Sequence, residues 1–270
     1  MSKPPILVLA PPASGKTTAL RYLKPELAKR TLYVNCDDKS LPWVGKTDIK
    51  LYDAGCPTLI PNILDSAGKS GKFDLIVIDT ITLAMQEYAR KFLNTTAPKY
   101  STDASGNVIS NPDYIALDRT GSKIDGMSGW GRYGTLVCDI IAAAKKTGVQ
   151  VVIFGHLSSV ADDSGNYKFR CPLQGAIGKQ GIEGLFDVVM HAQQMKLKDL
   201  SKEGQDHQWL GTTESRKGTE ARYVYQVDHT KNTAGTHDIR SPDGLWPEDV
   251  QFIDNNLQMV FDRFEEVYGE

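Results

Sequence analysis

Continuous runs of apolar residues recur through the first 160 residues of the chain. They cover residues 6–10 (ILVLA), 31–36 (TLYVNC), 73–82 (FDLIVIDTIT) and 149–156 (VQVVIFGH). A short apolar run without alternation is typical of a strand buried on both faces of a parallel sheet. The pattern therefore predicts four buried strands.

Segments with helical spacing lie between these runs. Residues 17–29 follow the first strand and predict a helix. Residues 131–147 predict another, with Leu136, Val137, Ile140, Ile141 and Ala144 on one face. Two lysines in its last turn and Gly148 just after it are common stop signals. Strands that alternate with helices predict an α/β fold, with a mainly parallel central sheet flanked by helices and right-handed crossovers.

The pattern changes after residue 185. Residues 186–197, 207–213 and 221–230 look like successive antiparallel strands that extend the same sheet. A helix at about 250–267 carries apolar residues at helical spacing, which we expect to pack in the core: Ile253, Leu257, Val260, Phe261 and Phe264. We expect residues 1–270 to form a single domain.

Two stretches, 95–130 and 158–181, show no regular pattern. Loops of this length in a compact domain are usually functional or mobile. They become candidate binding loops.

Composition narrows the class of protein. The chain has 270 residues, 40% hydrophobic and 24% charged, with a formal net charge of −2. This charge argues against a uniformly basic nucleic-acid coat, so any such contact needs a local patch. The four cysteines contain no CxxC pair, which gives no sign of a zinc site or a disulfide framework. The first apolar run is too short for a signal peptide or a membrane span, so we expect a cytoplasmic protein with no membrane partner.

The loop after the first strand resembles a phosphate-binding loop. In the pattern G-x-x-x-x-G-K-[ST], backbone N–H groups surround phosphate, the lysine reaches the β- and γ-phosphates and the hydroxyl binds Mg²⁺. Gly15, Lys16 and Thr17 match this pattern, follow a buried strand and open a predicted helix. The candidate nucleotide-binding residues are Ala10, Pro11, Pro12, Ala13, Ser14, Gly15, Lys16, Thr17 and Thr18. We expect ATP and Mg²⁺ as cofactors.

Ala10 departs from the pattern, which has glycine at this position. The substitution matters only if the position requires a positive φ, which a Cβ makes costly. Pro11 and Pro12 stiffen the loop in a preset conformation. We expect Ala10 to be tolerated.

Asp79 closes the most hydrophobic of the predicted strands. An acidic residue at the end of a second strand is the usual partner of the P-loop hydroxyl in holding Mg²⁺. Thr17 and Asp79 are therefore the candidate metal residues.

The stretch APPASGKTT superficially resembles the P-loop of AAA+ ATPases. That family places its water-activating glutamate directly after the Mg²⁺ aspartate, where this chain has Thr80. In RecA-like ATPases the catalytic acid instead follows the strand after the P-loop helix. Asp37 and Asp38 stand at that place. The alternative for this pair is a solvated turn or a helix cap, but the carboxyl end of a sheet strand favours function.

The resemblance to RecA-like ATPases extends along most of the chain, to about residue 235. Small members encoded by bacteriophages, including single-strand annealing and recombination proteins, have a similar tail: PLQGAIGKQGIEGLFDVVMHAQ and YVYQVDHTKNTAG. The resemblance implies that His156 senses the γ-phosphate and that Lys231 reaches a neighbouring subunit's ATP. The alternatives are a hydrogen-bonded core histidine and a solvated turn lysine.

This resemblance implies a RecA-like ATPase that binds single-stranded DNA and promotes annealing or recombination. It implies slow or DNA-stimulated hydrolysis, because an aspartate stands where RecA has glutamate. It also implies self-association into a ring or filament, a possible single-strand-binding partner protein and, if phage-encoded, the cytoplasm of a bacterial host.

RecA-like proteins bind DNA through two loops at the positions of 95–130 and 158–181. The candidate DNA-binding residues, aromatic and basic, are Arg132, Tyr167, Lys168, Phe169, Arg170 and Lys179, with Tyr100, Arg119, Lys123, Trp130 and Tyr133 nearby. Rings that stack on bases and cations that follow phosphates suit single strands. The alternative for residues 166–170 is a small hairpin with one packed face.

Two other functions fit the P-loop. A kinase of small molecules or nucleotides would use 158–181 as a lid, but that stretch has only Arg170 to lie over phosphates. A non-catalytic module would use ATP to stabilise an assembly.

Overall fold

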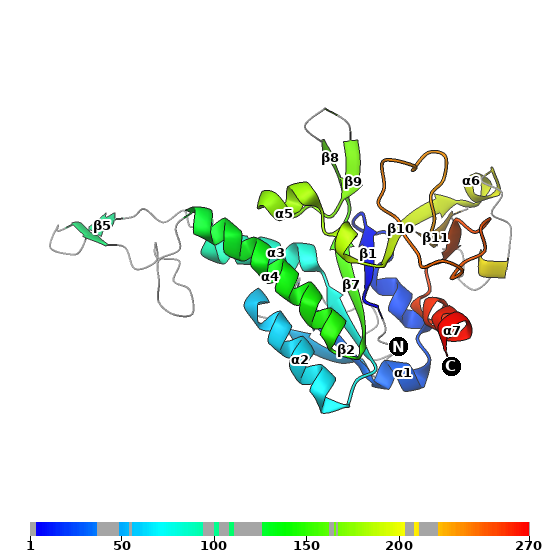
Figure 1. Cartoon of the computed structure of the whole chain (residues 1–270), viewed down its shortest axis with the longest axis horizontal. Coiled ribbons are helices and arrows are strands. Elements are labelled where there is room, and N and C mark those ends of the chain that lie inside the picture. Colours follow the sequence, from blue (N-terminus) through cyan, green and yellow to red (C-terminus); the bar gives the residue numbers. More distant parts are fainter. Residues whose placement is uncertain are drawn as a thin grey trace.

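A central sheet of eight strands organises the chain (Figure 1), in the order β12-β11-β10-β1-β7-β4-β2-β3. The structure is a computed structural model that describes residues 4–36, 49–53, 56–93, 100–102, 108–110, 126–161, 165, 167–202, 208–210 and 221–269. Strands β3 to β10 of this order run parallel, while β11 and β12 are antiparallel to their neighbours. The expected mainly parallel sheet with an antiparallel extension is confirmed.

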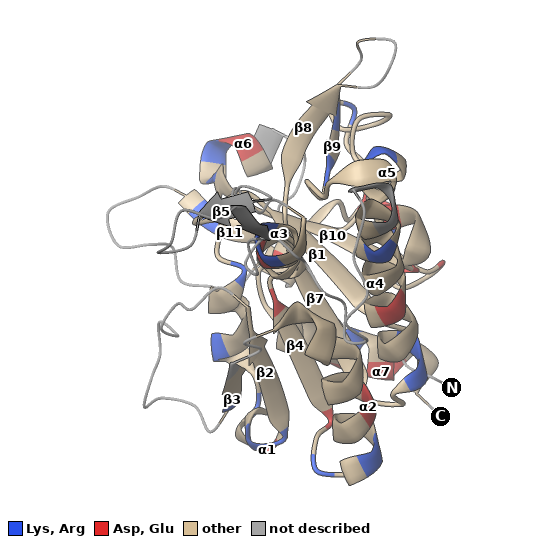
Figure 2. Ribbon diagram, turned by 90° about the vertical axis from the view of Figure 1, so that its left-hand side faces the viewer, with Lys and Arg blue, Asp and Glu red and all other residues tan. Residues whose placement is uncertain are grey.

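The strands of the sheet are β1 (Ile6–Ala10), β2 (Thr31–Asn35), β3 (Lys50–Asp53), β4 (Leu75–Asp79), β7 (Gln150–His156), β10 (Val188–Lys196), β11 (Ala221–Gln226) and β12 (Phe252–Asp254). Two separate hairpins are β5 (Tyr100–Thr102) with β6 (Val108–Ser110), and β8 (Ser158–Ala161) with β9 (Tyr167–Arg170). The β8–β9 hairpin stands out from the sheet in both Figure 1 and Figure 2.

The α-helices are α1 (Pro25–Lys29), α2 (Ile60–Ser70), α3 (Ile81–Phe92), α4 (Gly126–Lys146), α5 (Gly175–Gln180), α6 (Leu197–Lys202) and α7 (Leu257–Tyr268). Short 3₁₀ helices are η1 (Thr17–Tyr22), η2 (Pro57–Leu59), η4 (Glu183–Leu185) and η5 (Gln208–Leu210).

The sheet separates two hydrophobic cores, because successive side chains of a strand point to opposite faces. In β1, Leu7 and Leu9 pack with helices α2, α3 and α4, whereas Ile6 and Val8 pack with η1, α1 and α7. All four side chains are fully buried. Helices therefore cover both faces, as the continuous apolar runs predict, and the architecture is α/β with a mainly parallel central sheet.

The predicted helix 17–29 is wrong as a single element. It consists of η1 and α1, with extended backbone at Leu23 and Lys24 between them. Pro25 occupies the first position of α1, and a proline disfavours helical backbone at the residue before it. The strand predicted at 73–82 also ends early, at Asp79, because Thr80 caps α3 by accepting a hydrogen bond from Leu83 N at 3.2 Å.

The C-terminal predictions need three corrections. Strand β10 is parallel to β1 and antiparallel only to β11. Residues 208–210 form a 3₁₀ helix where a strand was expected over 207–213. The helix expected at about 250–267 begins at Leu257, since Ile253 belongs to β12 and Asn256 caps the helix by accepting from Met259 N.

The stretch 158–181 is regular, contrary to the prediction. It contains the β8–β9 hairpin and helix α5. The hairpin alternative for residues 166–170 is the one that the described residues bear out, with Ser159 paired to Phe169. Within 95–130, the described residues form β5, β6 and the start of α4.

Candidate nucleotide-binding site

The P-loop leaves the carboxyl end of β1 and returns into η1. Within it, the Ser14 hydroxyl donates to the carbonyl of Pro11 at 2.6 Å. Gly15 has φ +89°, and Ala13 has φ +59°. Ala10 is a buried strand residue that does not share this left-handed backbone. The predicted tolerance of Ala10 therefore has a structural reason, and the costly alanine of the loop is Ala13.

Lys16 is 9% exposed and lies against its own loop. Its Nζ donates to the carbonyls of Ala10 and Pro11, at 3.2 Å each. The side chain thus folds back over the start of its own loop. Thr18 follows in η1, half-buried.

Asp79 accepts two hydrogen bonds on one carboxylate oxygen. Thr17 Oγ1 donates to Asp79 Oδ2 at 2.9 Å, and the hydroxyl of Tyr33 donates to the same atom at 2.6 Å. Asp79 is 4% exposed. The peptide bond between Asp79 and Thr80 is cis. The structure therefore brings the two predicted metal residues into direct contact, although 62 residues separate them in sequence.

A hydroxyl and a carboxylate are the oxygen ligands that Mg²⁺ accepts, usually alongside several waters and substrate phosphates. The donor set of Thr17 and Asp79 therefore fits Mg²⁺ as expected. Tyr33 was not predicted to belong to this site. No local signal set it apart, because β2 (TLYVN) also contains the hydroxyl of Thr31 and the amide of Asn35. A buried tyrosine usually directs its hydroxyl to a polar partner, but the partner itself comes from the fold.

His156 lies beside the P-loop because β7 separates β1 from β4. In the register of the sheet, His156 is opposite Ala10, and Leu157 N donates to the Ala10 carbonyl at 3.0 Å. The backbone N–H of His156 donates to Thr82 Oγ1 at 2.9 Å, which ties the strand to α3. The next strand along holds Asp79, which pairs with Phe154 of β7.

Asp37 and Asp38 lie outside the described residues. The chain approaches them along β2, whose last described neighbour, Cys36, donates its N–H to the Asp79 carbonyl at 2.8 Å. The pair therefore follows a residue that contacts the predicted metal residue.

The candidate DNA-binding residues on β9 differ in their surroundings. Tyr167 is 64% exposed, whereas Phe169 stacks on His237 with ring centroids 4.4 Å apart. Arg170 donates from Nη1 to the Lys179 carbonyl at 2.7 Å and approaches Asp238 at 3.9 Å. Part of this set thus packs the hairpin onto the body of the protein.

The remaining candidates lie on helices. Lys179 is exposed on α5, and Arg132 is half-buried on α4. Figure 2 shows the basic residues of β9 and α5 on the same upper part of the molecule. Tyr133 is 1% exposed, and Gln174 N donates to its hydroxyl, so this neighbour belongs to the core rather than to a surface. Arg119 and Lys123 lie outside the described residues, as does the side chain of Tyr100.

Lys231 is exposed in the loop between β11 and β12. This loop is joined to the hairpin by a hydrogen bond from Phe169 N to the Thr236 carbonyl at 2.8 Å. It is joined to β10 by paired backbone hydrogen bonds between Val189 and Arg240. Lys231 thus belongs to a loop that spans the hairpin and the strand next to β1.

Two buried titratable groups lie near this loop and were not predicted. His191, opposite Leu9 in the sheet, is 2% exposed, and neither ring nitrogen has a partner among the described residues. Burial, together with the nearby His237 and His229, lowers the pKa of His191 to about 3. Burial likewise raises the pKa of Glu183, whose Oε1 accepts from Cys171 N.

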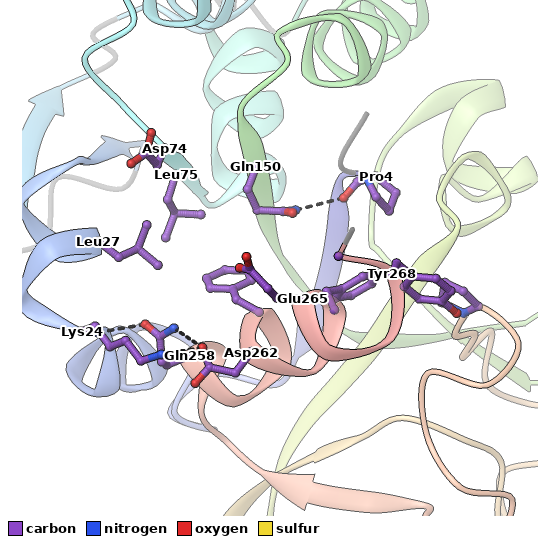
Figure 3. A pocket seen from close by; sticks show the side chains of 14 residues that line it. Pro4, Lys24, Leu27, Asp74, Leu75, Gln150, Gln258, Asp262, Glu265 and Tyr268 are labelled. Atoms are coloured by element: carbon purple, nitrogen blue, oxygen red, sulfur yellow. Dashed lines mark hydrogen bonds and ion pairs between the residues drawn. The ribbon is translucent and has the colours of Figure 1, made fainter. Parts of the chain in front are cut away.

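A cavity of about 740 Å³ lies at the other end of the central strands, between the starts of β4 and β7 and helix α7 (Figure 3). Its apolar lining includes Leu27, Leu75 and Phe261. It does not contain any residue predicted for the nucleotide site.

Comparison with known proteins finds an AAA-type family, the resemblance that the P-loop sequence had suggested only superficially. A family model described as "AAA domain" matches residues 2–236, which include the P-loop, Asp79 and the β8–β9 hairpin. No curated protein matches the sequence. In the described part of the chain, no helix combines the length and apolarity needed to span a membrane.

Proposed function

The chain belongs to the AAA domain family of P-loop ATPases, and from that premise we propose that it is a RecA-like ATPase that binds single-stranded DNA and promotes annealing or recombination. The family implies nucleotide use and, usually, Mg²⁺. The family does not specify a partner. The proposal that the partner is DNA rests on the β8–β9 hairpin.

In the proposed ATPase, Lys16 and the P-loop amides hold the β- and γ-phosphates. Thr17 and Asp79 would hold Mg²⁺, which neutralises charge that develops on the phosphates when bound. Tyr33 fixes the orientation of the Asp79 carboxylate through its hydrogen bond. Asp37 or Asp38 would orient the attacking water.

The observation that carries the DNA proposal is the continuity of β7 with the hairpin. β7 places His156 opposite Ala10 and, one residue later, turns into β8. Only Leu157 separates His156 from the first residue of the hairpin. A displacement of His156 on γ-phosphate binding would therefore be passed directly to β8. Switching of a segment by the γ-phosphate is a known device of NTPases.

The hairpin offers an exposed aromatic ring and a cation. Tyr167 supplies a ring for base stacking, and Lys168 follows it on β9, on the other face of the strand. Lys179 and Arg132 would follow the phosphates on the adjoining helices. This combination suits single strands, because stacking tolerates any base and cations follow the backbone.

The proposal includes assembly into a ring or filament. Lys231, exposed on the loop attached to the hairpin, would reach the ATP of a neighbouring subunit. A single-strand-binding protein is a further possible partner in this scheme.

Binding to a labelled single-stranded oligonucleotide at low salt, with ATP, ADP or no nucleotide, tests the proposal. We expect ATP to change the affinity of the wild-type protein and not that of Lys16→Ala. Tyr167→Ala should weaken binding about tenfold, because stacking on one base contributes about 1–3 kcal/mol. Tyr268→Ala is the matched control, because it removes a partly exposed tyrosine of α7 beside the cavity at the other end of the strands. Absence of binding under every nucleotide condition would overturn the DNA assignment.

Product analysis separates the rival functions. Release of inorganic phosphate supports the ATPase, whereas a phosphorylated acceptor would support a kinase. ATP-dependent assembly without turnover or DNA binding would support a non-catalytic module. Asp37→Asn and Asp38→Asn should identify the residue that orients water, and that role is wrong if neither lowers turnover.

A further inference from the structure

The carbonyl of Gly15 is held by a side chain from the far end of the chain. Asn255 Nδ2 donates to Gly15 O at 2.8 Å, across 240 residues of sequence. Asn255 is 1% exposed, and it lies beyond the residues that the family model matches. This contact is therefore a feature of the chain's own C-terminal segment.

The contact is part of a close-fitting support. Asn255 directly follows β12, and its N–H donates to the Tyr223 carbonyl of β11 at 3.2 Å. A Cβ added at Gly15 would lie 2.6 Å from Asn255 Nδ2 and 2.9 Å from Tyr223 Cδ1. Both side chains thus press on the one P-loop residue that has no side chain of its own.

The direction of the Gly15 carbonyl sets the direction of the next amide. In a planar trans peptide the C=O and the following N–H point in opposite directions. Asn255 Nδ2 and Ala19 N, at 2.8 and 3.2 Å, both donate to Gly15 O. They hold this carbonyl toward the body of the protein, so the N–H of Lys16 points the other way. In a P-loop, that is the direction of the phosphates.

The same C-terminal unit holds the far end of the P-loop segment. Gln258 Oε1 accepts from Lys24 N at 2.9 Å, at the break between η1 and α1. Figure 3 shows Gln258 between Lys24 and Asp262, and Figure 1 shows α7 against the N-terminal helices. The segment from Gly15 to Lys24 is therefore held at its two ends by Asn255 and Gln258.

Stability alone is a poor reason for this asparagine. Asn255 Oδ1 is buried and has no partner among the described residues. A buried acceptor without a partner is unfavourable for folding. The hydrogen bond from Nδ2 to the Gly15 carbonyl is the interaction that favours asparagine at this position.

We propose that Asn255 is a positioning residue of the nucleotide site: by holding the Gly15 carbonyl, it aims the Lys16 amide at the phosphates of the bound nucleotide. The inference rests on the proposed binding of ATP. It adds to that site one residue from outside the P-loop, through its contact with Gly15.

Calorimetric titration of the full-length protein with Mg–ATP tests the inference, with urea unfolding of each variant alongside. Asn255→Ala should weaken ATP binding about tenfold, in the range that removal of an orienting outer contact costs a site. Asn256→Ala is the control, because it removes the neighbouring cap of α7 without touching Gly15. This control should lose stability and keep its ATP affinity within about twofold.

Asn255→Leu keeps a similar size, removes the unpartnered oxygen and lacks the donor. We expect it to fold at least as stably as Asn255→Ala and still bind ATP about tenfold more weakly. Equal ATP affinity in the wild type and both Asn255 variants would overturn the inference. So would an equal loss of ATP affinity in Asn256→Ala, because the effect would then follow stability. Failure of the wild type to bind ATP at all would instead overturn the proposed function.

Discussion

Two buried polar groups lie in neighbouring parts of the same sheet and have opposite surroundings. Asp79 receives hydrogen bonds from Thr17 and Tyr33, whereas both ring nitrogens of His191 lack a partner in the described part of the chain. The Asp79 carboxyl group has two hydroxyl donors to one of its oxygens. The His191 group stays neutral, because burial makes its protonation unfavourable. Of these two buried groups, only Asp79 has hydrogen-bond partners among the described residues, and this fits its proposed role as a Mg²⁺ residue.

Replacing the carboxylate of Asp79 should have the largest effect. Asp79→Asn keeps the size and removes the charge that would hold Mg²⁺, so Mg²⁺-dependent ATP turnover should fall at least about 100-fold. Asp74→Asn is the control from the other end of β4, where the carboxylate forms a surface ion pair with Arg30. Phosphate-release assays should show little change for Asp74→Asn, and similar losses in both variants would contradict the role of Asp79.

Protonation of His191 should destabilise the fold as the pH falls. The unfolded chain binds this proton near pH 6.5 and the folded chain only near pH 3, since burial lowers the pKa to about 3. Stability that is present above pH 6.5 is therefore lost between pH 6.5 and 3, by about 1.4 kcal/mol per unit at most. Urea unfolding at pH 6.5 and 4.5 should show wild type losing about 2 kcal/mol more than His191→Leu. Parallel pH profiles would contradict this origin.

Two buried tyrosines differ in whether the hydroxyl has a hydrogen-bond partner in the described part of the chain, and this difference can be tested by removing each hydroxyl. Tyr33→Phe removes the hydrogen bond to Asp79. The Mg²⁺ concentration needed for half-maximal ATP turnover should therefore rise about tenfold. The Tyr225 hydroxyl is buried and unpartnered within the described residues, and burial raises its pKa well above the usual range. Tyr225→Phe should leave turnover unchanged and unfolding stability equal or higher. A Mg²⁺ titration of both variants decides the comparison.

The two alanines of the P-loop should respond to glycine with opposite signs. Ala13→Gly relieves a left-handed backbone at φ +59° and should stabilise the protein by about 0.5–1 kcal/mol. Ala10→Gly weakens a buried strand and should destabilise it by about 1 kcal/mol. Urea unfolding of the two variants measures both effects, and a gain from Ala10→Gly would contradict the strand conformation of that residue.

The sequence was sufficient for the elements whose signal is local. The apolar runs of β1 and β7 predicted buried parallel strands, and the P-loop pattern with Asp79 predicted the pair that the fold brings within 2.9 Å. Pro25 also carried a local signal for the break after η1, which the helical pattern of 17–29 obscured. These features depend on backbone preferences and side-chain periodicity, which neighbouring residues determine.

The residues that contact the P-loop and Asp79 from distant parts of the chain could not be predicted, because their neighbours in sequence carry no signal of these contacts. Tyr33 resembles any strand tyrosine until β2 and β4 pair. Asn255 resembles a turn residue until β12 brings it to Gly15. The hairpin at 158–181 was treated as irregular because its strands are short and polar, and its register comes from pairing and from contact with Thr236.

The contact between Gly15 and Asn255 cannot form until Asn255 has been synthesised, long after the P-loop. Translation adds about 5–20 residues per second, and these two residues are 240 positions apart. The P-loop therefore waits about 12–48 seconds after its own translation for the residue that holds its glycine. During that interval the nascent chain contains the P-loop without the side chain that holds the Gly15 carbonyl in the folded protein.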